Sequence, residues 1–503
     1  MVLDARFTVP RRFLRSAFTL LGMVEITTPA GRLAGTVQET DCGTTRAFRG
    51  IQYATAARFA PPVRVTSWKG TRDASEFGPA APQPVGGPLD GLVPGAFRGA
   101  TDEAACLTLN VWTPADPSAT PRAVLVWFPG GAFTIGASSQ PAYDGARLGA
   151  EQDVVIVTCN YRLGALGFVD ARGFGGVANC GLRDALAALE WVRDNIAAFG
   201  GDPGQVTVFG ESAGGGIVLH LCSSPHASGL FRGAIVQSGA TFNTLDEARA
   251  ALVLDALASE LDLARPGLLA DAEVDELIRA QAASAMALLP TVGMMPFHPM
   301  VDGDVLPETP VAALGHGAAR GIPMIVGTTT DEMRLFLDVS GAAVAREKLC
   351  ARVAHVVGGE PARAAEIVGV YESELHTTDT NEIWAAIFTD VQMQKPADAI
   401  RDAHRAHGPT FSYLFGRRAV DPRLGACHGI DIPFTFGNFG DGWAEFIGLD
   451  DAAQRLGRRL RDSWAAFARH GEPGWAPVPA TMRFDDASIV VDDPLRARLA
   501  AIA

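Results

Sequence analysis

The chain has 503 residues, of which 48% are hydrophobic and 19% are charged, a balance typical of a globular protein with a large core. Its formal net charge of −14 argues against nucleic acids and anionic membranes as partners, because both bind to basic surfaces. The seven cysteines include no C-x-x-C pair for zinc or dithiol chemistry. We therefore expect free thiols in a reducing compartment and a cytoplasmic protein.

The N-terminal segment differs from the rest of the chain. Arg11, Arg12 and Arg15 precede a short apolar stretch at 17–22, which is the order found in a signal peptide. The apolar stretch is short and no small-x-small cleavage site follows it. We therefore expect a disordered extension over residues 1–22 and a single folded domain over 23–503, with secretion as the alternative. No run approaches the ~18 apolar residues of a membrane-spanning helix.

Strand patterns recur along the chain. Two alternating stretches within residues 24–52 flank Pro29-Ala30-Gly31 and predict an edge hairpin. Further strands are predicted from apolar runs at residues 107–112, 123–128, 153–158, 206–209, 234–238 and 323–327. The run at 410–415 is expected to be the last major strand.

Helical patterns separate these strands. Helical spacing predicts helices at 181–199 and 451–470, and helical insertions around 245–290 and 341–408. Strands that alternate with helices indicate the α/β class, with a large central, mostly parallel, twisted sheet flanked by helices. Ligands of such sheets bind at the carboxyl ends of the strands.

A serine stands where the strand at 206–209 turns into an apolar helical pattern. Gly210-Glu-Ser-Ala-Gly214 fits G-x-S-x-G, the strand-to-helix turn that holds a serine in strained geometry above a sheet. The following helix directs free N–H groups toward the same point. The alternative is a merely structural glycine turn, which the flanking strand and helix disfavour.

A second glycine turn follows the core strand at 123–128. Its sequence, Pro129-Gly-Gly-Ala-Phe133, offers backbone amides without large side chains, as an oxyanion hole requires. A plain turn remains the alternative at this point.

An acid and a histidine are needed to activate a serine hydroxyl. Asp331 and Glu332 both follow the strand at 323–327, and their chemistry does not separate them. Asp302 and Asp304 are expected to be turn formers instead. Of the ten histidines, His428 alone lies in a short glycine-flanked loop directly after a predicted core strand. The order serine, acid, histidine is that of α/β-hydrolases.

Longer stretches resemble one family. Residues 195–203 and 209–215 resemble its serine signature, and residues 160–168, residues 327–332 and His428 with Asp431 add to the match. From about Met23 to the C-terminus the chain resembles the type-B carboxylesterase family, the esterase and cholinesterase branch of the α/β-hydrolases. It is similar to the bacterial para-nitrobenzyl-esterase-like members.

The resemblance implies the site residues. By this resemblance Ser212 is the nucleophile, Glu332 rather than Asp331 is the acid, and His428 is the base. The amides of Gly131, Ala132 and Ala213 are then expected to form the oxyanion hole.

Three features depart from the pattern of the family. Ala104 and Ala105 replace the usual Glu-Asp before Cys106, so an acidic residue that normally forms an ion pair is missing. The usual upstream cysteine partner of Cys106 is replaced by alanine within residues 77–84. Pro129 stands where histidine or tyrosine commonly precedes the glycines, a change that could alter the oxyanion loop.

Choline-binding members of the family hold the ammonium group against a tryptophan shortly before the Leu-x-Leu-Asn strand. No tryptophan occurs here between Trp68 and Trp112, and the loop offers Phe97 beside Arg98. Phenylalanine is the weaker partner of a cation, and an inward-pointing guanidinium would repel it.

The predicted function is therefore a serine carboxylic-ester hydrolase that forms an acyl-enzyme from neutral short- to medium-chain or aryl esters. The alternatives are an amide or lactam hydrolase, and a catalytically silent, cholinesterase-like binding protein. We expect no cofactor, metal, nucleic acid or membrane partner. A small-molecule ester is the expected partner, and the sequence is compatible with a monomer.

Overall fold

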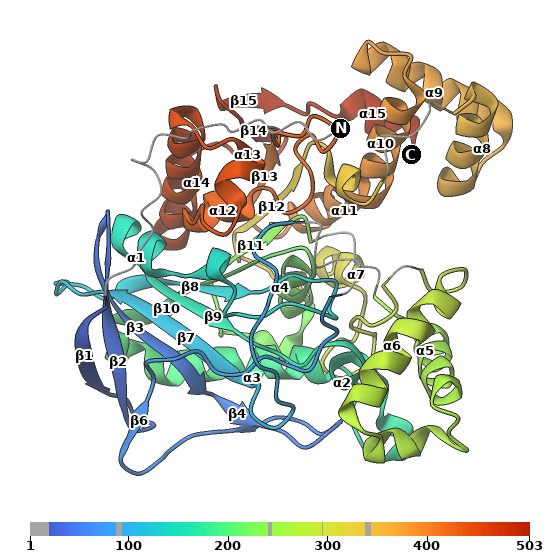
Figure 1. Ribbon diagram of the computed structural model, residues 1–503. Coiled ribbons are helices and arrows are strands. Elements are labelled where there is room, and N and C mark those ends of the chain that lie inside the picture. The colour runs from blue at the N-terminus through green and yellow to red at the C-terminus, as the bar shows by residue number, and fades with distance from the viewer. Residues whose placement is uncertain (1–19, 87–92, 240–243, 294, 338–343) are drawn as a thin grey trace, which may run out of the picture.

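The computed structural model describes residues 20–86, 93–239, 244–293, 295–337 and 344–503 (Figure 1). Residues 1–19, which make up most of the expected N-terminal extension, lie outside the described residues. The first strand, β1, begins at Leu20 and pairs antiparallel with β2, which confirms the predicted hairpin. Its turn is closed by hydrogen bonds between Thr28 and Gly31.

One large sheet dominates the described part of the chain. It has 13 strands in the order β1-β2-β3-β7-β9-β8-β10-β11-β12-β13-β14-β15, with β6 beside β2. The strands are β1 (Leu20–Thr27), β2 (Arg32–Thr40), β3 (Gly43–Gln52), β6 (Thr71–Asp73), β7 (Thr108–Pro114), β8 (Arg122–Phe128), β9 (Val155–Cys159), β10 (Gly201–Glu211), β11 (Gly233–Gln237), β12 (Met324–Thr329), β13 (Thr410–Phe415), β14 (Ala480–Phe484) and β15 (Ile489–Asp492). A separate small sheet pairs β4 (Ala54–Thr55) with β5 (Val63–Arg64).

The middle of the large sheet is parallel. From β9 through β8, β10, β11, β12 and β13 to β14, each neighbouring pair runs in the same direction. Toward both edges the pairs are antiparallel, except that β6 pairs parallel with β2. Because parallel strands are covered on both faces, they consist of continuous apolar runs. The predicted α/β architecture, with a large and mostly parallel sheet, is confirmed.

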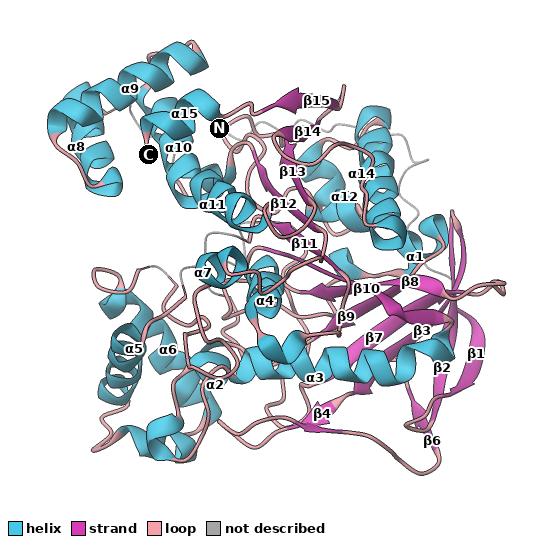
Figure 2. Cartoon of the chain, turned by 180° about the vertical axis from the view of Figure 1, so that it is seen from behind, coloured by secondary structure: helices cyan, strands magenta, loops and turns pink. Residues whose placement is uncertain are grey.

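Helices cover both faces of the sheet (Figure 2). The helices of the described residues are α1 (Ala146–Gln152), α2 (Gly164–Phe168), α3 (Cys180–Asn195), α4 (Ala213–Ser223), α5 (Glu247–Glu260), α6 (Val274–Leu288), α7 (Pro310–Gly315), α8 (Arg346–Val357), α9 (Pro361–Leu375), α10 (Thr380–Thr389), α11 (Lys395–His404), α12 (Ile432–Phe436), α13 (Trp443–Ile447), α14 (Asp451–His470) and α15 (Arg496–Ala501). Shorter turns are the 3₁₀ segments η1 (Pro141–Tyr143), η2 (Arg172–Phe174), η3 (Ile196–Phe199), η4 (Pro225–Ala227), η5 (Pro266–Asp271) and η6 (Glu332–Leu335), and the π-helical η7 (Asp390–Gln394).

Strand β8 shows how its alternating side chains build two cores. Val124 and Val126 belong to the core that includes residues of α3 and α4, whereas Leu125 and Trp127 belong to the core that includes residues of α1, α12 and α14. Successive side chains of a strand point to opposite faces, so one continuous apolar strand serves both layers.

Two groups of helices extend from the sheet on the same side of the molecule (Figure 1). One group is α5 with α6, and the other holds α8, α9 and α10 together with the C-terminal helix α15. The second group has a hydrophobic core of its own, which includes Leu349, Val368, Tyr371 and Ile502. The C-terminal end of the chain is thus packed against a segment more than a hundred residues earlier.

The expectation that the strand at 410–415 is the last major one was wrong. Strand β14 pairs parallel with it, and β15 extends the sheet by one antiparallel strand. Of the five residues of β14 only Thr481 and Phe484 are buried, so the sequence shows no long apolar run there. All seven cysteines are free, in agreement with the sequence-based expectation.

Candidate active site

Ser212 lies between the end of β10 and the start of α4. Its backbone has φ 55° and ψ −124°, a sparsely populated conformation for a residue with a side chain. The turn is tight because its flanking glycines touch backbone: a Cβ on Gly214 would lie 1.9 Å from the carbonyl oxygen of Phe128. A Cβ on Gly210 would lie 2.5 Å from the carbonyl carbon of Gly214. The two glycines of the G-x-S-x-G motif are therefore required by close packing.

The loop after β8 passes next to the serine. A Cβ on Gly130 would lie 3.2 Å from the Cβ of Ser212. Gly131 has φ +117° and Ala132 has φ 53°, and the carbonyl of Gly131 accepts hydrogen bonds from the amides of residues 134 and 135. Tyr161 donates its hydroxyl to the carbonyl of Pro129 at 2.7 Å, which anchors the start of the loop.

Three amides are left available at this point. Those of Gly131, Ala132 and Ala213 have no hydrogen-bond acceptor among the described residues. Ala213 is the first residue of α4, whose N-terminal amides lack intrahelical partners and carry the positive end of the helix dipole. This part of the turn is suited to bind negative charge.

His428 and Glu332 form a buried hydrogen bond. The Nδ1–H of His428 donates to Oε2 of Glu332 at 2.6 Å, and the side chain of Glu332 is fully buried. The second carboxylate oxygen, Oε1, accepts the hydroxyl of Ser238 at 2.6 Å and the amide of Thr329 at 2.7 Å. The carboxylate thus has a donor on each oxygen, which fixes its orientation and that of the imidazole.

Asp331 points elsewhere. Its carboxylate accepts the hydroxyl of Thr330 at 2.8 Å and the amide of Ala426 at 3.0 Å, and it pairs with Arg334 at 3.2 Å. The structure therefore separates the two acids that the sequence left as rivals: Glu332 contacts His428, whereas Asp331 holds the loops around it.

The sequence analysis assigned no role to Glu211, the variable residue of the motif before Ser212. Its Oε1 lies 3.2 Å from Nε2 of His428, so a second carboxylate contacts the imidazole from the opposite side. Burial raises the pKa of Glu211 to about 8, although the nearby imidazole opposes this effect. Burial lowers the pKa of His428, but the carboxylates of Glu211 and Glu332 outweigh it and raise that pKa to about 9.

A third buried carboxylate, Asp431, completes the surroundings of His428. It accepts hydrogen bonds from Gln237 at 2.9 Å and from the hydroxyl of Tyr413 at 3.0 Å, and burial raises its pKa. The sequence analysis noted Asp431, three residues after His428, as part of the family resemblance but gave it no role.

Other histidines have structural partners. His220 contacts the carbonyl of Gly216 at 2.6 Å, and burial lowers its pKa to about 4. His404 contacts the hydroxyl of Thr410 at 2.8 Å and His407 the carbonyl of Gly315 at 2.7 Å. These rings serve helix and loop packing.

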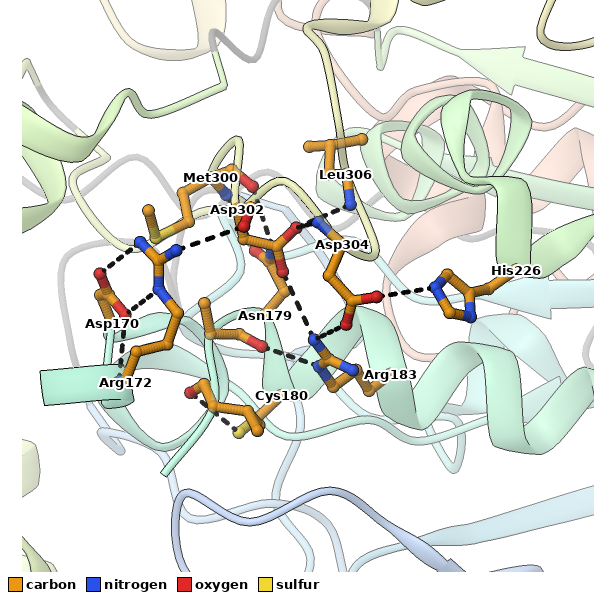
Figure 3. Close-up of polar contacts among 12 residues, drawn as sticks. Asp170, Arg172, Asn179, Cys180, Arg183, His226, Met300, Asp302, Asp304 and Leu306 are labelled. Atoms are coloured by element: carbon orange, nitrogen blue, oxygen red, sulfur yellow. Dashed lines mark hydrogen bonds and ion pairs between the residues drawn. The ribbon is translucent and has the colours of Figure 1, made fainter. Parts of the chain in front are cut away.

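Asp302 and Asp304 form a turn, as expected (Figure 3). Oδ1 of Asp302 accepts the amides of Asp304 at 3.0 Å and Leu306 at 2.9 Å. Asp304 pairs with Arg183 at 2.7 Å and contacts His226 at 3.0 Å. Both carboxylates therefore bind groups of this turn and its neighbours, which agrees with a structural role.

The structure shows the surroundings of the three positions that depart from the family pattern. An ion pair is present although Ala104 and Ala105 lack charge, because the preceding Glu103 pairs with Arg58 at 2.6 Å. Cys106 is buried and free. The carbonyl of Pro129 is held by Tyr161, as described above.

Phe97 and Arg98 line a cavity of about 800 Å³ formed mainly by residues 77–79 and 93–100. Ser139, Pro141 and Asp441 also line it. Ser212, Glu332 and His428 do not line it. In the described residues no group of His, Cys, Asp or Glu has the arrangement of a metal site, and no helix there is long and apolar enough to cross a membrane.

Comparison with known proteins agrees with this architecture. The model of the carboxylesterase family matches residues 23–484. The para-nitrobenzyl esterase of Bacillus subtilis (strain 168) is 34% identical over 487 residues, covering 93% of this chain and 95% of that protein. A probable N-octanoylanthranilate hydrolase of Rhodococcus erythropolis is 33% identical over 469 residues, covering 90% and 94%. A crystal structure of a Geobacillus stearothermophilus carboxylesterase superimposes with a TM-score of 0.80 at 34% identity, covering 95% of this chain and all of that one.

The charges around His428 predict its titration. In the wild type the imidazole is expected to lose its proton well above the usual 6.5, because the carboxylates stabilise the cation. Glu211→Gln removes one of these charges and should move the titration to lower pH by at least about 1 unit. Nitrogen NMR of labelled histidine measures both midpoints.

Asp304→Asn is the matched control, since it removes a carboxylate from the surface turn. It should leave the His428 midpoint in place. A midpoint unchanged by Glu211→Gln would contradict the contact between Glu211 and the imidazole.

Proposed function

This chain belongs to the carboxylesterase family, and on that premise we propose that Ser212, His428 and Glu332 are the catalytic triad of a serine carboxylic-ester hydrolase. The observation that carries the proposal is the 2.6 Å hydrogen bond between His428 and the fully buried Glu332. It is formed in loops at the carboxyl ends of β12 and β13, in the same sheet whose strand β10 ends at the serine. Ligands of parallel sheets bind at such ends.

The proposed reaction begins with proton transfer. Because Nδ1 of His428 donates to Glu332, Nε2 is the nitrogen that takes the proton of Ser212 as the hydroxyl attacks the ester carbonyl. The imidazolium then returns this proton to the departing alcohol, and an acyl-serine is left. Water, activated by the same imidazole, releases the acid and regenerates the enzyme.

The tetrahedral intermediates carry negative charge on the former carbonyl oxygen. We propose that the amides of Gly131, Ala132 and Ala213 bind this oxygen. Their lack of acceptors among the described residues and the start of α4 at Ala213 support the assignment. Each such donor contributes about 3 to 4 kcal/mol to transition-state stabilisation.

Glu211 is proposed to act as a second stabiliser of the imidazolium. Its Oε1 contacts Nε2, the nitrogen that would receive the serine proton. When Glu211 is ionised it favours the protonated imidazole, and when it is neutral the imidazole is a better proton acceptor for the serine.

We propose neutral short- to medium-chain or aryl esters as substrates. Amide hydrolysis is the second candidate, since the relative from Rhodococcus erythropolis is named as a hydrolase of an N-acyl compound. The buried free thiols support a cytoplasmic location. Residues 23–503 are proposed to act as one catalytic domain with helical insertions around 245–290 and 341–408.

The triad predicts the effects of three substitutions. Ser212→Ala should leave a folded protein whose kcat for an activated ester falls by about 10⁶. Glu332→Gln should lower kcat by about 10⁴, because the imidazole loses the carboxylate that orients it and stabilises its cation. Asp331→Asn, the matched control, should have a far smaller effect, since Asp331 contacts Arg334 and not His428.

Steady-state kinetics with a chromogenic ester, alongside circular dichroism to verify folding, provide the measurement. Equal losses from Glu332→Gln and Asp331→Asn would remove the basis for choosing the acid. A Ser212→Ala protein with a tenth of wild-type turnover would exclude the nucleophile.

The loop that carries Phe97 predicts discrimination against cationic alcohols. It offers a phenyl ring beside a guanidinium, where choline-binding relatives have an indole, and a cation on tryptophan gains about 0.5 to 2 kcal/mol. We expect a neutral 3,3-dimethylbutyl ester to have a much higher kcat/KM than the choline ester of the same acid. Comparable values for this isosteric pair would refute the prediction.

A further inference from the structure

Helices α10 and α11 are joined without a loop by the π-helical turn η7, over Asp390–Gln394, and together they form one rod. The amide of Lys395 donates to the carbonyl of Asp390, five residues earlier, as in a π-helix. The rod lies beside strand β12, whose end leads to Glu332 (Figure 2). Such turns occur mostly as single interruptions of α-helices and often at functional sites.

Two side chains of this rod hold the backbone on both sides of Glu332. The hydroxyl of Thr389 accepts the amide of Met333 at 3.1 Å, directly after the acid. Gln394 accepts the hydroxyl of Thr328 at 2.6 Å and donates to the carbonyl of Thr329 at 3.0 Å, before the acid. Gln394 is 2% exposed and Thr389 is fully buried.

Gln394 is linked to the carboxylate of Glu332 through the backbone of Thr329. Thr329 uses its carbonyl for Gln394 and its amide for Oε1 of Glu332 at 2.7 Å. The other carboxylate oxygen contacts His428 at 2.6 Å. A short series of buried hydrogen bonds therefore leads from Gln394 to the imidazole.

The π-helical turn explains how both side chains reach the same place. In an α-helix each residue turns by about 100°, so residues five apart lie about 140° apart around the axis. Hydrogen bonding between residues i and i+5 widens the turn and brings such residues closer together around the axis. Thr389 and Gln394 are five residues apart, and without the wider turn they would face different directions.

The turn is anchored from its other side. Asp390 is fully buried, accepts the hydroxyl of Tyr371 at 2.6 Å, and pairs with Arg498 of α15 at 2.7 Å and 2.8 Å. Removing one partner of a buried ion pair is costly, so this contact favours a single position of the turn. Lys395 also donates to the carbonyl of Ile502 at 2.7 Å.

We propose that Thr389 and Gln394 are positioning residues of the catalytic acid, and that the π-helical turn exists to bring both of them to the backbone around Glu332. The inference rests on the proposed role of Glu332. The two residues would act on the reaction through the backbone around Glu332, without contacting the substrate.

Gln394→Leu tests the proposal, because it keeps the volume and removes both hydrogen bonds. We expect kcat to fall about 10- to 100-fold with little change in KM, as for small displacements of catalytic groups. The acidic limb of the pH profile should also move to lower pH, because a displaced carboxylate stabilises the imidazolium less. Gln152→Leu is the matched control, since Gln152 is a buried glutamine of α1 that binds Asp462. It should leave kcat and the pH profile unchanged.

A double-mutant cycle separates positioning from general destabilisation. If Gln394 acts through the acid, Gln394→Leu should cause no further loss of kcat in the Glu332→Gln background. An equal loss in both backgrounds would overturn the proposal. Full activity of Glu332→Gln alone would instead overturn the proposed triad.

Thr389 provides an independent test if Gln394→Leu fails to fold. Thr389→Val removes the hydroxyl that accepts the Met333 amide but keeps the shape of the side chain. Thr389→Ser keeps this hydroxyl. We expect the valine variant to lose kcat and the serine variant to recover most of it. Equal activity of the two variants would contradict the role of this hydroxyl.

Discussion

The buried hydrogen bond between Glu332 and His428 is the interaction on which the arrangement of this protein depends. A carboxylate without solvent needs a donor for each of its oxygens, because an unpaired buried charge costs several kcal/mol. Here the donors come from three neighbouring strands: Ser238 follows β11, Thr329 ends β12 and His428 lies in the loop after β13. Only a parallel sheet brings three consecutive strand ends to one edge, so the architecture and the electrostatics of the site are two aspects of one constraint.

Close packing of the backbone around Ser212 is the second constraint on the site. The strained conformation of Ser212 costs about 1 to 3 kcal/mol and persists because the surrounding structure determines it. Gly214 lies against the carbonyl of Phe128 with no room for a methyl group, and Gly130 lies against Glu211 and Ser212. The same contacts bring the amides of the glycine loop and of α4 to one place. Strain at Ser212 and the preorganisation of the amides proposed to bind the oxyanion therefore have a common cause.

Sequence reasoning located the elements whose patterns are local. The motif around Ser212 and the apolar strands before it are contiguous, and the loop that holds His428 follows a strand directly, so these elements could be found without coordinates. Asp331 and Glu332 could not be separated by their chemistry, because adjacent residues in a turn point in different directions for reasons that lie in residues 426 and 428. Glu211 and Gln394 were missed because their partners are distant in sequence. The strands β14 and β15 were missed because they bury few side chains.

The central claim is that Ser212 is a nucleophile activated by His428 and Glu332, and covalent trapping tests it most directly. An activated phosphonate ester should phosphonylate one residue per chain, and mass spectrometry of the peptides should locate it at Ser212. The modification should be lost in Ser212→Ala and slowed strongly in Glu332→Gln, with hydrolysis lost in parallel. Modification of a different residue, or full inactivation without an adduct at Ser212, would contradict the account.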